Sequence, residues 1–437
     1  MKQILAIDVG SFKTIAVIAN YDKEKLSISG VGISKSNGVK KGAIVNIDET
    51  VKSIKESVAH AKRIAGIDIN KAIVSISSAY TQSITSNGVV NIPENEINLK
   101  EINRAIQNAL YNADIPQDYL VLQAIPYNFK VDELTEIDDP QGMTGSRLEV
   151  SLHIILAKKS GMENLKKTFQ QAGIEILNIV NAGYASALAV LNDDEKELGV
   201  AVIDIGASTS DMAIFVNKAL RHIDFLAVGS HHITSDLSMA LHTKPSEAEY
   251  IKTHFEELIK SGEDLIEISV IGSDNEKQKA SLSTITQVIS ARIEETFLLL
   301  NKEIQRSGLE SQIGAGIVLT GGFTNFYNVK EIASQFFEGH PVRLGKPKII
   351  NGLVENLQKP EFSTVIGLLM YATGKSSKYE KDSNQQFVTE TIEEIQQPQI
   401  VVQQEAKKNE KEDLARIAQK EDINPIKKFI NWLNNLF

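Results

Sequence analysis

The chain has 437 residues, 42% of them hydrophobic, and a formal net charge of −10. This length allows more than one hydrophobic core, so two lobes with smaller additions are expected, while the acidic balance argues against broad nucleic-acid binding. The absence of cysteine excludes disulfides and, with no signal peptide after Met1 and no apolar run of about 18 residues, favours a cytosolic protein that does not cross a bilayer.

The first predicted elements are three short strands within residues 4–36, a helix over 49–65 and a strand over 71–78. This order suits one ribonuclease-H-like half of an α/β protein. The turn between the first two strands reads Asp-Val-Gly-Ser-Phe-Lys-Thr. It holds Asp8, Gly10, Ser11, Lys13 and Thr14.

Residues 82–159 differ in character, with a hairpin, a helix near 99–110, a strand predicted to end at Pro126 and another strand over 147–157. Few turns here are glycine-rich or acidic in the way a phosphate site requires. We therefore expect an inserted subdomain used for contacts, with a functionally silent insertion as the alternative. A helix over 162–171, a strand and a helix over 182–191 complete the first half.

Residues 200–215, VAVIDIGASTSDMAIF, repeat the strand–turn–strand pattern with Asp204, Gly206 and Thr209 in the turn. One such hairpin is usually an ordinary turn, but two copies indicate a duplicated chain. A buried strand that delivers a carboxylate into a turn of small residues brings backbone N–H groups close to a ligand. Phosphate with a divalent metal fits that arrangement best.

A helix is predicted from Pro245 to about residue 260, and Ser246 and Glu249 have the spacing of a capping box. Glu249 and Lys252 share one face of this helix, either as ligand contacts or as an exposed salt bridge. A long amphipathic helix follows over 283–306. Residues 316–326 then form a buried strand that breaks into a new helix at Gly321 and Gly322.

The segment from 375 to about 422 contains no glycine, is rich in Gln, Glu and Lys, and is predicted to be a disordered tether. Residues 424–437, NPIKKFINWLNNLF, place apolar side chains on one helical face and lysines and asparagines on the other. This pattern is typical of an interfacial membrane helix, the alternative being a helix that docks on its own core. The candidate membrane-binding residues are Ile426, Lys427, Lys428, Phe429, Ile430, Trp432, Leu433, Leu436 and Phe437.

The two hairpins, the AGYASALAVL helix and VLTGGFTNF together resemble the nucleotide pattern of the actin, Hsp70 and sugar-kinase superfamily. Within it, GSHHITSDL, EAEYIK, AGIVLTGGFTN and STVIGLLMYA resemble the FtsA family of bacterial division proteins, over roughly residues 1–375. The resemblance implies an actin-like α/β fold with two ribonuclease-H-like lobes around a nucleotide cleft. The implied parts are subdomain 1A at 1–81, 160–196 and 356–374, inserted subdomain 1C at 82–159, 2A at 197–228 and 312–355, 2B at 229–311, a linker at 375–423 and a membrane-targeting amphipathic helix at 424–437.

The resemblance also implies ATP and Mg²⁺ as ligands. Asp8 and Asp204 would hold Mg²⁺ through water, Glu249 and Lys252 would reach the ribose and adenine, and the two glycines would let the backbone approach the nucleoside. The full candidate set for the nucleotide is Asp8, Gly10, Ser11, Lys13, Thr14, Asp204, Gly206, Thr209, Glu249, Lys252, Gly321 and Gly322. Ala182 stands where related ATPases carry a polar residue, and Ala207-Ser208 replaces a Gly-Gly pair, so at most slow ATP hydrolysis is expected.

The family resemblance implies a division protein that polymerises on the cytoplasmic face of the inner membrane at the division site, contacts anionic lipids and anchors the tubulin-like GTPase FtsZ. Subdomain 1C would contribute to filament contacts and recruit later division proteins. Arg292 and Glu295 are the candidates for the FtsZ C-terminal peptide, the alternative being solvated helix charges. Two other functions remain open: a PilM-like pilus adaptor, and a kinase or chaperone ATPase of the same superfamily.

Overall fold

The computed structural model of the chain describes residues 2–22, 25–272, 276–348, 350–352 and 355–388. Within these ranges no helix is long and apolar enough to cross a membrane. The predicted membrane helix at 424–437 and the linker beyond residue 388 lie outside the described residues.

The first sheet has the strand order β11-β6-β1-β2-β3-β19. Its strands β1, β2 and β3 are antiparallel, whereas β6 and β11 run parallel to β1. Helix α1 packs on β2 and β3, as the predicted order of three strands, a helix and a strand requires. The bounds are β1 Lys2–Val9, β2 Lys13–Asp22, β3 Lys25–Lys35, β4 Val39–Lys40, β5 Ala43–Ile44, α1 Ile47–Ala65, β6 Lys71–Ile76, η1 Ser78–Tyr80, α3 Lys159–Ala172, β11 Glu175–Asn181 and β19 Asn351–Gly352.

The second sheet repeats this plan in the order β14-β13-β12-β17-β18. Again three antiparallel strands come first in the chain and two parallel strands are added beside the first of them. The duplication predicted from the two hairpins therefore extends to five strands in each half. The bounds are α5 Asp193–Leu198, β12 Val200–Ile205, β13 Ser210–Val216, β14 Ala219–Leu226, η2 Glu310–Gln312, β17 Ile317–Thr320, η3 Gly322–Asn325 and β18 Val342–Leu344.

Two apolar helices, α4 Ala182–Val190 and α11 Ser363–Tyr371, join the two halves. They pack against each other, and one hydrophobic core contains residues of both sheets together with both helices. The helices approach closely at Gly367, where an added Cβ would lie 1.7 Å from the carbonyl oxygen of Ala185. The turn η5, Pro360–Phe362, leads directly into α11, and η4 spans Glu355–Gln358.

The other face of the second sheet is covered by a separate core that includes the long helix α9. The predicted helix from Pro245 divides at His254 into α7 and α8, and the predicted capping box is wrong. Lys244 is the N-cap and Pro245 is the first helical residue, so the side chain of Glu249 is directed elsewhere. The bounds are α6 His231–Ala240, α7 Pro245–Thr253, α8 Phe255–Ser261, β15 Leu265–Ser269, β16 Lys277–Ser281, α9 Leu282–Arg306 and α10 Val329–Phe336.

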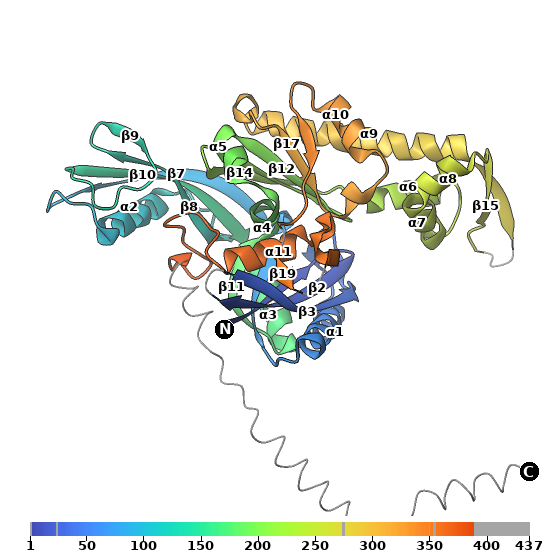
Figure 1. Cartoon of the computed structure of the whole chain (residues 1–437), viewed down its shortest axis with the longest axis horizontal. Helices are drawn as coiled ribbons and strands as arrows, with labels where there is room; N and C mark the ends of the chain where they lie inside the picture. The colour runs from blue at the N-terminus through green and yellow to red at the C-terminus, as the bar shows by residue number, and fades with distance from the viewer. Residues whose placement is uncertain (1, 23–24, 273–275, 349, 353–354, 389–437) are drawn as a thin grey trace, which may run out of the picture. The chain divides into compact units, whose positions relative to one another are not determined.

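The inserted residues form a four-stranded sheet in the order β7-β10-β8-β9, with α2 against β7 and a core of their own (Figure 1). The prediction that a strand ends at Pro126 is wrong, because β8 continues to Val131. The register against β10 shifts at this point, so that Leu152 faces Pro126 and Ser151 faces Asn128. A bulge tolerates a proline, which has no N–H to donate. The bounds are β7 Thr81–Asn91, α2 Leu99–Asn112, β8 Tyr119–Val131, β9 Leu134–Ile137 and β10 Arg147–Lys158.

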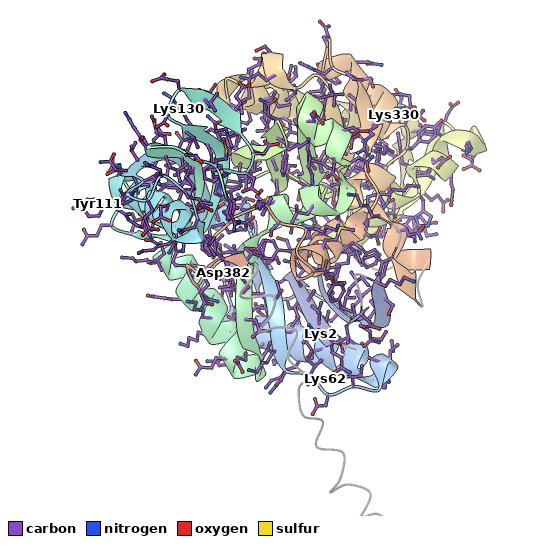
Figure 2. All side chains as sticks on the ribbon, turned by 60° about the vertical axis from the view of Figure 1, so that its left-hand side comes forward. Lys2, Lys62, Tyr111, Lys130, Lys330 and Asp382 are labelled. Atoms are coloured by element: carbon purple, nitrogen blue, oxygen red, sulfur yellow. The ribbon has the colours of Figure 1, made fainter. Side chains whose placement is uncertain are left out.

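Residues 375–388, here called the strap, correct the prediction that a disordered linker begins at residue 375. Glu380 is 1% exposed and accepts hydrogen bonds from Gln123 (2.8 Å), Tyr184 (2.8 Å) and Tyr371 (3.1 Å). Asp382 is fully buried, in contrast to Tyr111, which projects from α2 with 90% of its surface exposed (Figure 2).

Contacts on both sides of the strap fix it to the inserted sheet and to the main core. Lys381 exchanges two backbone hydrogen bonds with Ala124 of β8, at 2.9 and 3.0 Å. Phe387 belongs to the core of the inserted sheet, and Val388 belongs to the core between the two main sheets. The strap therefore holds the insertion against the first half of the duplicated fold.

Candidate functional site

The two Asp-x-Gly turns have the same backbone geometry. The N–H of Gly10 donates to the carbonyl of Lys13 at 3.2 Å, and the N–H of Gly206 donates to the carbonyl of Thr209 at 2.9 Å. Each aspartate lies two residues before its glycine, at or near the end of a mostly buried strand. The turns are therefore structural copies.

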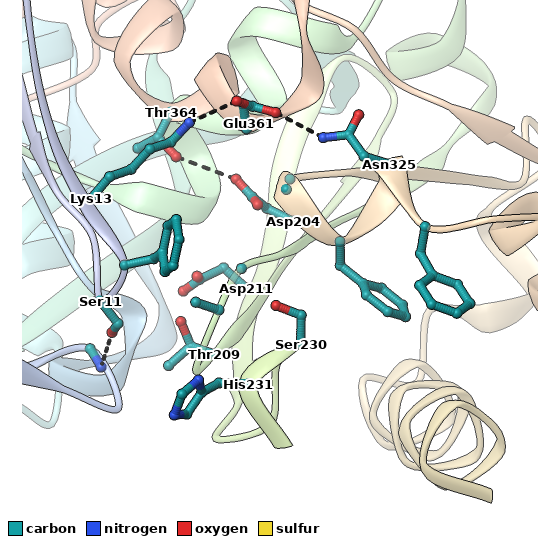
Figure 3. Close-up of a pocket in the computed structure, with 18 of the residues that line it drawn as sticks. Ser11, Lys13, Asp204, Thr209, Asp211, Ser230, His231, Asn325, Glu361 and Thr364 are labelled. Atoms are coloured by element: carbon teal, nitrogen blue, oxygen red, sulfur yellow. Dashed lines mark hydrogen bonds and ion pairs between the residues drawn. The ribbon is translucent and has the colours of Figure 1, made fainter. Parts of the chain in front are cut away.

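A pocket of about 510 Å³ lies between these turns and collects side chains from both halves (Figure 3). Aromatic residues of η3 and α8 line one part of it, and the acidic turns line another. The predicted nucleotide residues on its wall are Asp8, Ser11, Lys13, Asp204, Gly206, Thr209, Glu249, Lys252, Gly321 and Gly322.

Two predicted residues, Gly10 and Thr14, are not on the pocket wall. Thr14 is fully buried, and its hydroxyl lies 2.8 Å from that of Ser36. Successive residues of a strand face opposite sides, so a pocket that takes Lys13 excludes the side chain of Thr14.

The Ser11 hydroxyl accepts a 3.1 Å hydrogen bond from the N–H of Gly42 and thereby holds the β4–β5 hairpin.

Three aspartates share the acidic part of the pocket. Burial raises the pKa of Asp8 to about 6; a 2.6 Å hydrogen bond from Ser75 lowers it and the charge of Asp204 raises it. Burial also raises the pKa of Asp204, although the hydroxyl of Ser186 donates to it at 2.5 Å. Carboxylates that resist ionisation in this way favour a neighbouring cation.

The third aspartate, Asp211, was not identified from the sequence. Burial raises its pKa to about 7, and the charges of Asp204 and Asp8 raise it as well. Its carboxylate accepts a 3.3 Å hydrogen bond from the N–H of Ser78, which belongs to η1 of the first half. The sequence repeat does not point to it, because the corresponding position of the first copy is Ile15; only the pairing of β12 with β13 places Asp211 opposite Asp204.

Both lysines of the pocket are already paired with carboxylates. Lys13 lies 3.0 Å from Glu361, which also accepts a 2.8 Å hydrogen bond from Asn325 (Figure 3). Lys252 lies 2.7 Å from a carboxylate oxygen of Glu249, so the two residues form the salt bridge that their spacing allows. This salt bridge is partly buried on the pocket wall and is not an exposed surface pair. Neither Glu361 nor Asn325 was predicted.

The six pocket carboxylates outnumber the two lysines, and four of the six have no lysine of the pocket as partner. These are Asp8, Asp204, Asp211 and Glu256, of which Glu256 instead pairs with Lys260 at 2.6 Å. Within the described residues, no group of three or more His, Cys, Asp or Glu side chains is arranged to hold a metal ion by itself. A cation in this pocket would therefore need further ligands, such as water or phosphate oxygens.

The glycine pair after β17 has two different structural roles. Gly321 has φ +88°, and an added Cβ would lie 2.2 Å from a carboxylate oxygen of Asp204. At Gly322 the nearest atom to an added Cβ is 3.8 Å away, so the space beside it is open toward the pocket. Ala182 also lines the pocket, at the first residue of α4.

A second, shallower hollow of about 580 Å³ lies between α6 and α9. Arg292 donates to Asp236 at 2.5 Å and also contacts Glu295, so the predicted partner-binding pair belongs to an ordered charge cluster. Met239, 66% exposed, supplies an apolar side chain beside it. The lining residues are Asp236, Met239, Ala240, Val288, Ala291, Arg292 and Glu295.

Solved structures with similar folds include the PilM–PilN type IV pilus biogenesis complex, at 15% identity and a TM-score of 0.60, covering 84% of this chain and 97% of that chain. Another is MreB5 of Spiroplasma citri bound to ADP, at 12% identity and a TM-score of 0.50, covering 85% and 96%. These likenesses concern the fold alone. Two matching half-sheets around a shared pocket, with an inserted subdomain, define an actin-like protein.

The sequence comparisons give the family. The family model described as "Cell division protein FtsA" matches residues 201–367, and that described as "SHS2 domain inserted in FTSA" matches residues 78–156. Cell division protein FtsA of Helicobacter pylori is 38% identical over 412 residues, which are 87% of this chain and 84% of the relative. The Bacillus subtilis protein is 33% identical over 398 residues, 90% and 88% of the two chains. The chain belongs to the FtsA family of actin-like cell-division proteins.

Proposed function

We propose that the pocket binds ATP together with Mg²⁺. The observation that carries this proposal is the meeting of two matched Asp-x-Gly turns in one pocket whose carboxylates outnumber its lysines. A triphosphate is itself strongly anionic, so it needs a cation to enter such a site. The ADP bound in the MreB5 structure supports an adenine nucleotide for this fold.

In this proposal Asp8, Asp204 and Asp211 hold Mg²⁺ through water, and the turns at Gly10 and Gly206 present backbone N–H groups to the phosphates. The metal would neutralise the phosphate charge. The aromatic residues Phe255, Phe326 and Tyr327 line the part of the pocket that suits the base.

Slow hydrolysis at most is expected from the residue at the start of α4. Ala182 has no side-chain group that could orient or activate water. The nucleotide would then serve mainly to hold the two halves together and to favour filaments of this chain, with the inserted subdomain contributing to subunit contacts and to recruitment of later division proteins.

The hollow between α6 and α9 is our proposed site for the FtsZ C-terminal peptide. It combines the exposed Met239 with a charge cluster around Arg292 and Glu295. Apolar contact and oriented charge on a helix face are suited to a short amphipathic peptide.

Attachment to the cytoplasmic face of the inner membrane is proposed for residues 424–437, on their sequence pattern alone. One short amphipathic helix binds lipid weakly and reversibly, so stable attachment would come from many linked copies in a filament. The chain would thus join FtsZ to anionic lipid at the division site.

Vesicle flotation tests this function. Vesicles of phosphatidylglycerol and phosphatidylethanolamine are mixed with an FtsZ C-terminal peptide and with the full chain, the chain ending at residue 423, or Arg292→Glu. We expect the full chain to carry the peptide to the lipid layer, the shortened chain to leave both behind, and Arg292→Glu to float without the peptide. Undiminished flotation of the shortened chain would contradict the proposal that residues 424–437 attach the chain to the membrane.

A further inference from the structure

The partner of Lys13 is the feature of the pocket that the proposed function does not explain. Lys13 extends from the turn of the first half, and its ammonium group lies 3.0 Å from a carboxylate oxygen of Glu361 and 4.2 Å from the ring centre of Phe362. The two side chains of the ion pair are 21% and 25% exposed. The cation that faces the phosphate turn is therefore already neutralised by a residue of the chain.

Glu361 also connects Lys13 with the second half. Its other carboxylate oxygen accepts a 2.8 Å hydrogen bond from the amide of Asn325, at the end of the glycine-rich η3 turn (Figure 3). Glu361 itself lies on η5, immediately before α11. One carboxylate thus ties together the first turn, the glycine-rich turn and the start of a helix that both halves share.

An anionic ligand cannot approach Lys13 without meeting this carboxylate. A phosphate oxygen within hydrogen-bond distance of the ammonium group would lie a few ångströms from Glu361, and two like charges repel strongly in a partly buried site. Either the carboxylate moves away or the phosphate loses much of the attraction of Lys13. This repulsion by Glu361 weakens the binding of a ligand more as the negative charge near Lys13 increases. An uncharged nucleoside is not affected by it.

We infer that Glu361 is a displaceable carboxylate, which occupies Lys13 until the polyphosphate of a nucleotide replaces it, and whose displacement releases Asn325. This inference rests on the proposed nucleotide function and adds a specificity-determining residue to it. Only a ligand with enough negative charge competes with Glu361 for Lys13. When such a ligand displaces Glu361, the hydrogen bond between Asn325 of η3 and Glu361 of η5 is lost.

Calorimetric titration of the full chain with Mg·ATP, Mg·AMP and adenosine tests the inference. Glu361→Gln keeps the size of the side chain and removes its charge, so ATP affinity should rise by about three- to tenfold, the range expected for losing one partly exposed charge competitor. AMP affinity should rise less, and adenosine affinity should not change. Glu361→Asp keeps the charge but shortens the reach, and should raise ATP affinity by a smaller factor.

Lys13→Gln supplies the matching background. If Glu361 acts through Lys13, adding Glu361→Gln to a chain that already carries Lys13→Gln should raise ATP affinity by only a small part of the about three- to tenfold increase expected for Glu361→Gln alone. Glu331→Gln on the exposed surface of α10 controls for the change in net charge and should leave all three affinities unchanged.

The outcomes separate the two levels of the proposal. Unchanged or weaker ATP binding by Glu361→Gln and Glu361→Asp, with normal binding by the native chain, would overturn the displacement and leave the ATP site intact. An equal change for ATP and adenosine would show that Glu361 only supports the pocket structurally. Failure of the native chain to bind ATP would overturn the proposed function itself.

Discussion

Asp204 and Asp211 face each other directly across the β12–β13 pair, whereas the residue that faces Asp8 across β1–β2 is Ile15. The two halves of the fold are otherwise built alike, so this exchange of an apolar for an acidic residue makes the pocket asymmetric. The second half supplies two of the three aspartates at the acidic end. Two carboxylates on directly opposite strand positions are destabilising unless a proton or a cation lies near them.

Replacing Asp211 by Asn is predicted to change how stability depends on pH. Burial and the neighbouring aspartates raise the pKa of Asp211 to about 7 in the folded chain, well above its value in the unfolded chain. Between about pH 4 and pH 7 the folded state therefore holds a proton that the unfolded state has lost, and the free energy of unfolding falls as pH rises. The side chain of Asp211→Asn does not ionise, so its free energy of unfolding should not decrease with pH for this reason. At pH 7.5 the variant should therefore be more stable than the native chain, by the order of 2 kcal/mol.

Urea unfolding at several pH values, with EDTA and without nucleotide, measures this effect. The native chain and Asp211→Asn should have similar stability near pH 4 and diverge as pH rises. Parallel profiles over the whole range would mean that Asp211 ionises normally in the folded chain.

Removal of divalent cations is predicted to abolish most ATP binding. Among the described residues, the pocket carboxylates Asp8, Asp204 and Asp211 form no ion pair with a lysine, so a triphosphate without a metal meets net repulsion. With EDTA, ATP affinity should fall at least about a hundredfold, which corresponds to roughly 3 kcal/mol. Adenosine binding, which involves no phosphate, serves as the control and should not depend on the metal; equal ATP affinity with and without EDTA would refute this reading of the charges.

Alanine substitutions at Gly321 and Gly322 should affect different properties, namely the stability of the fold and the affinity for ATP. Gly321→Ala forces a positive φ on alanine and brings its Cβ against Asp204, so we expect a loss of about 2–4 kcal/mol in the free energy of unfolding. Gly322→Ala has open space beside it and should fold normally but bind ATP more weakly if the nucleoside lies there. Chemical unfolding and calorimetry separate the two effects, and equal destabilisation by both substitutions would be inconsistent with the structure.

Shortening the chain tests the strap. A chain that ends at residue 388 keeps Glu380 and Phe387 in place and should unfold at the same urea concentration as the full chain. A chain that ends at residue 374 loses both and leaves Tyr184 and Gln123 without their buried partner. We expect it to be less stable by about 3 kcal/mol or more. Identical stability of the two shortened chains would mean that residues 375–388 do not stabilise the fold and belong to the linker.

The succession of elements along the chain and the two Asp-x-Gly turns could be predicted because their signals are local. Continuous apolar runs mark β1, β2, β12 and β13, and Asp-x-Gly between such runs marks the turns. Lys13 and Thr14 look equally suitable in the sequence. Strand alternation, which assigns Lys13 to the pocket and Thr14 to the interior, separates them.

The remaining site residues depend on contacts between distant parts of the chain. Asp211 looks like one polar residue within a buried strand until the register places it opposite Asp204. Glu361 meets Lys13 across 348 positions of sequence, and Glu380 meets Gln123 across 257. A polar segment such as the strap reads as disordered when its composition is considered alone, because its partners are not its neighbours in the sequence.

Both acidic turns are proposed to hold one metal–nucleotide complex. Crystals of the chain grown with Mn²⁺ and a slowly hydrolysed ATP analogue test it by anomalous diffraction. We predict one Mn²⁺ peak among the carboxylates of Asp8, Asp204 and Asp211, with the phosphates between the turns at Gly10 and Gly206. A nucleotide bound elsewhere, or a metal peak remote from these aspartates, would contradict the account.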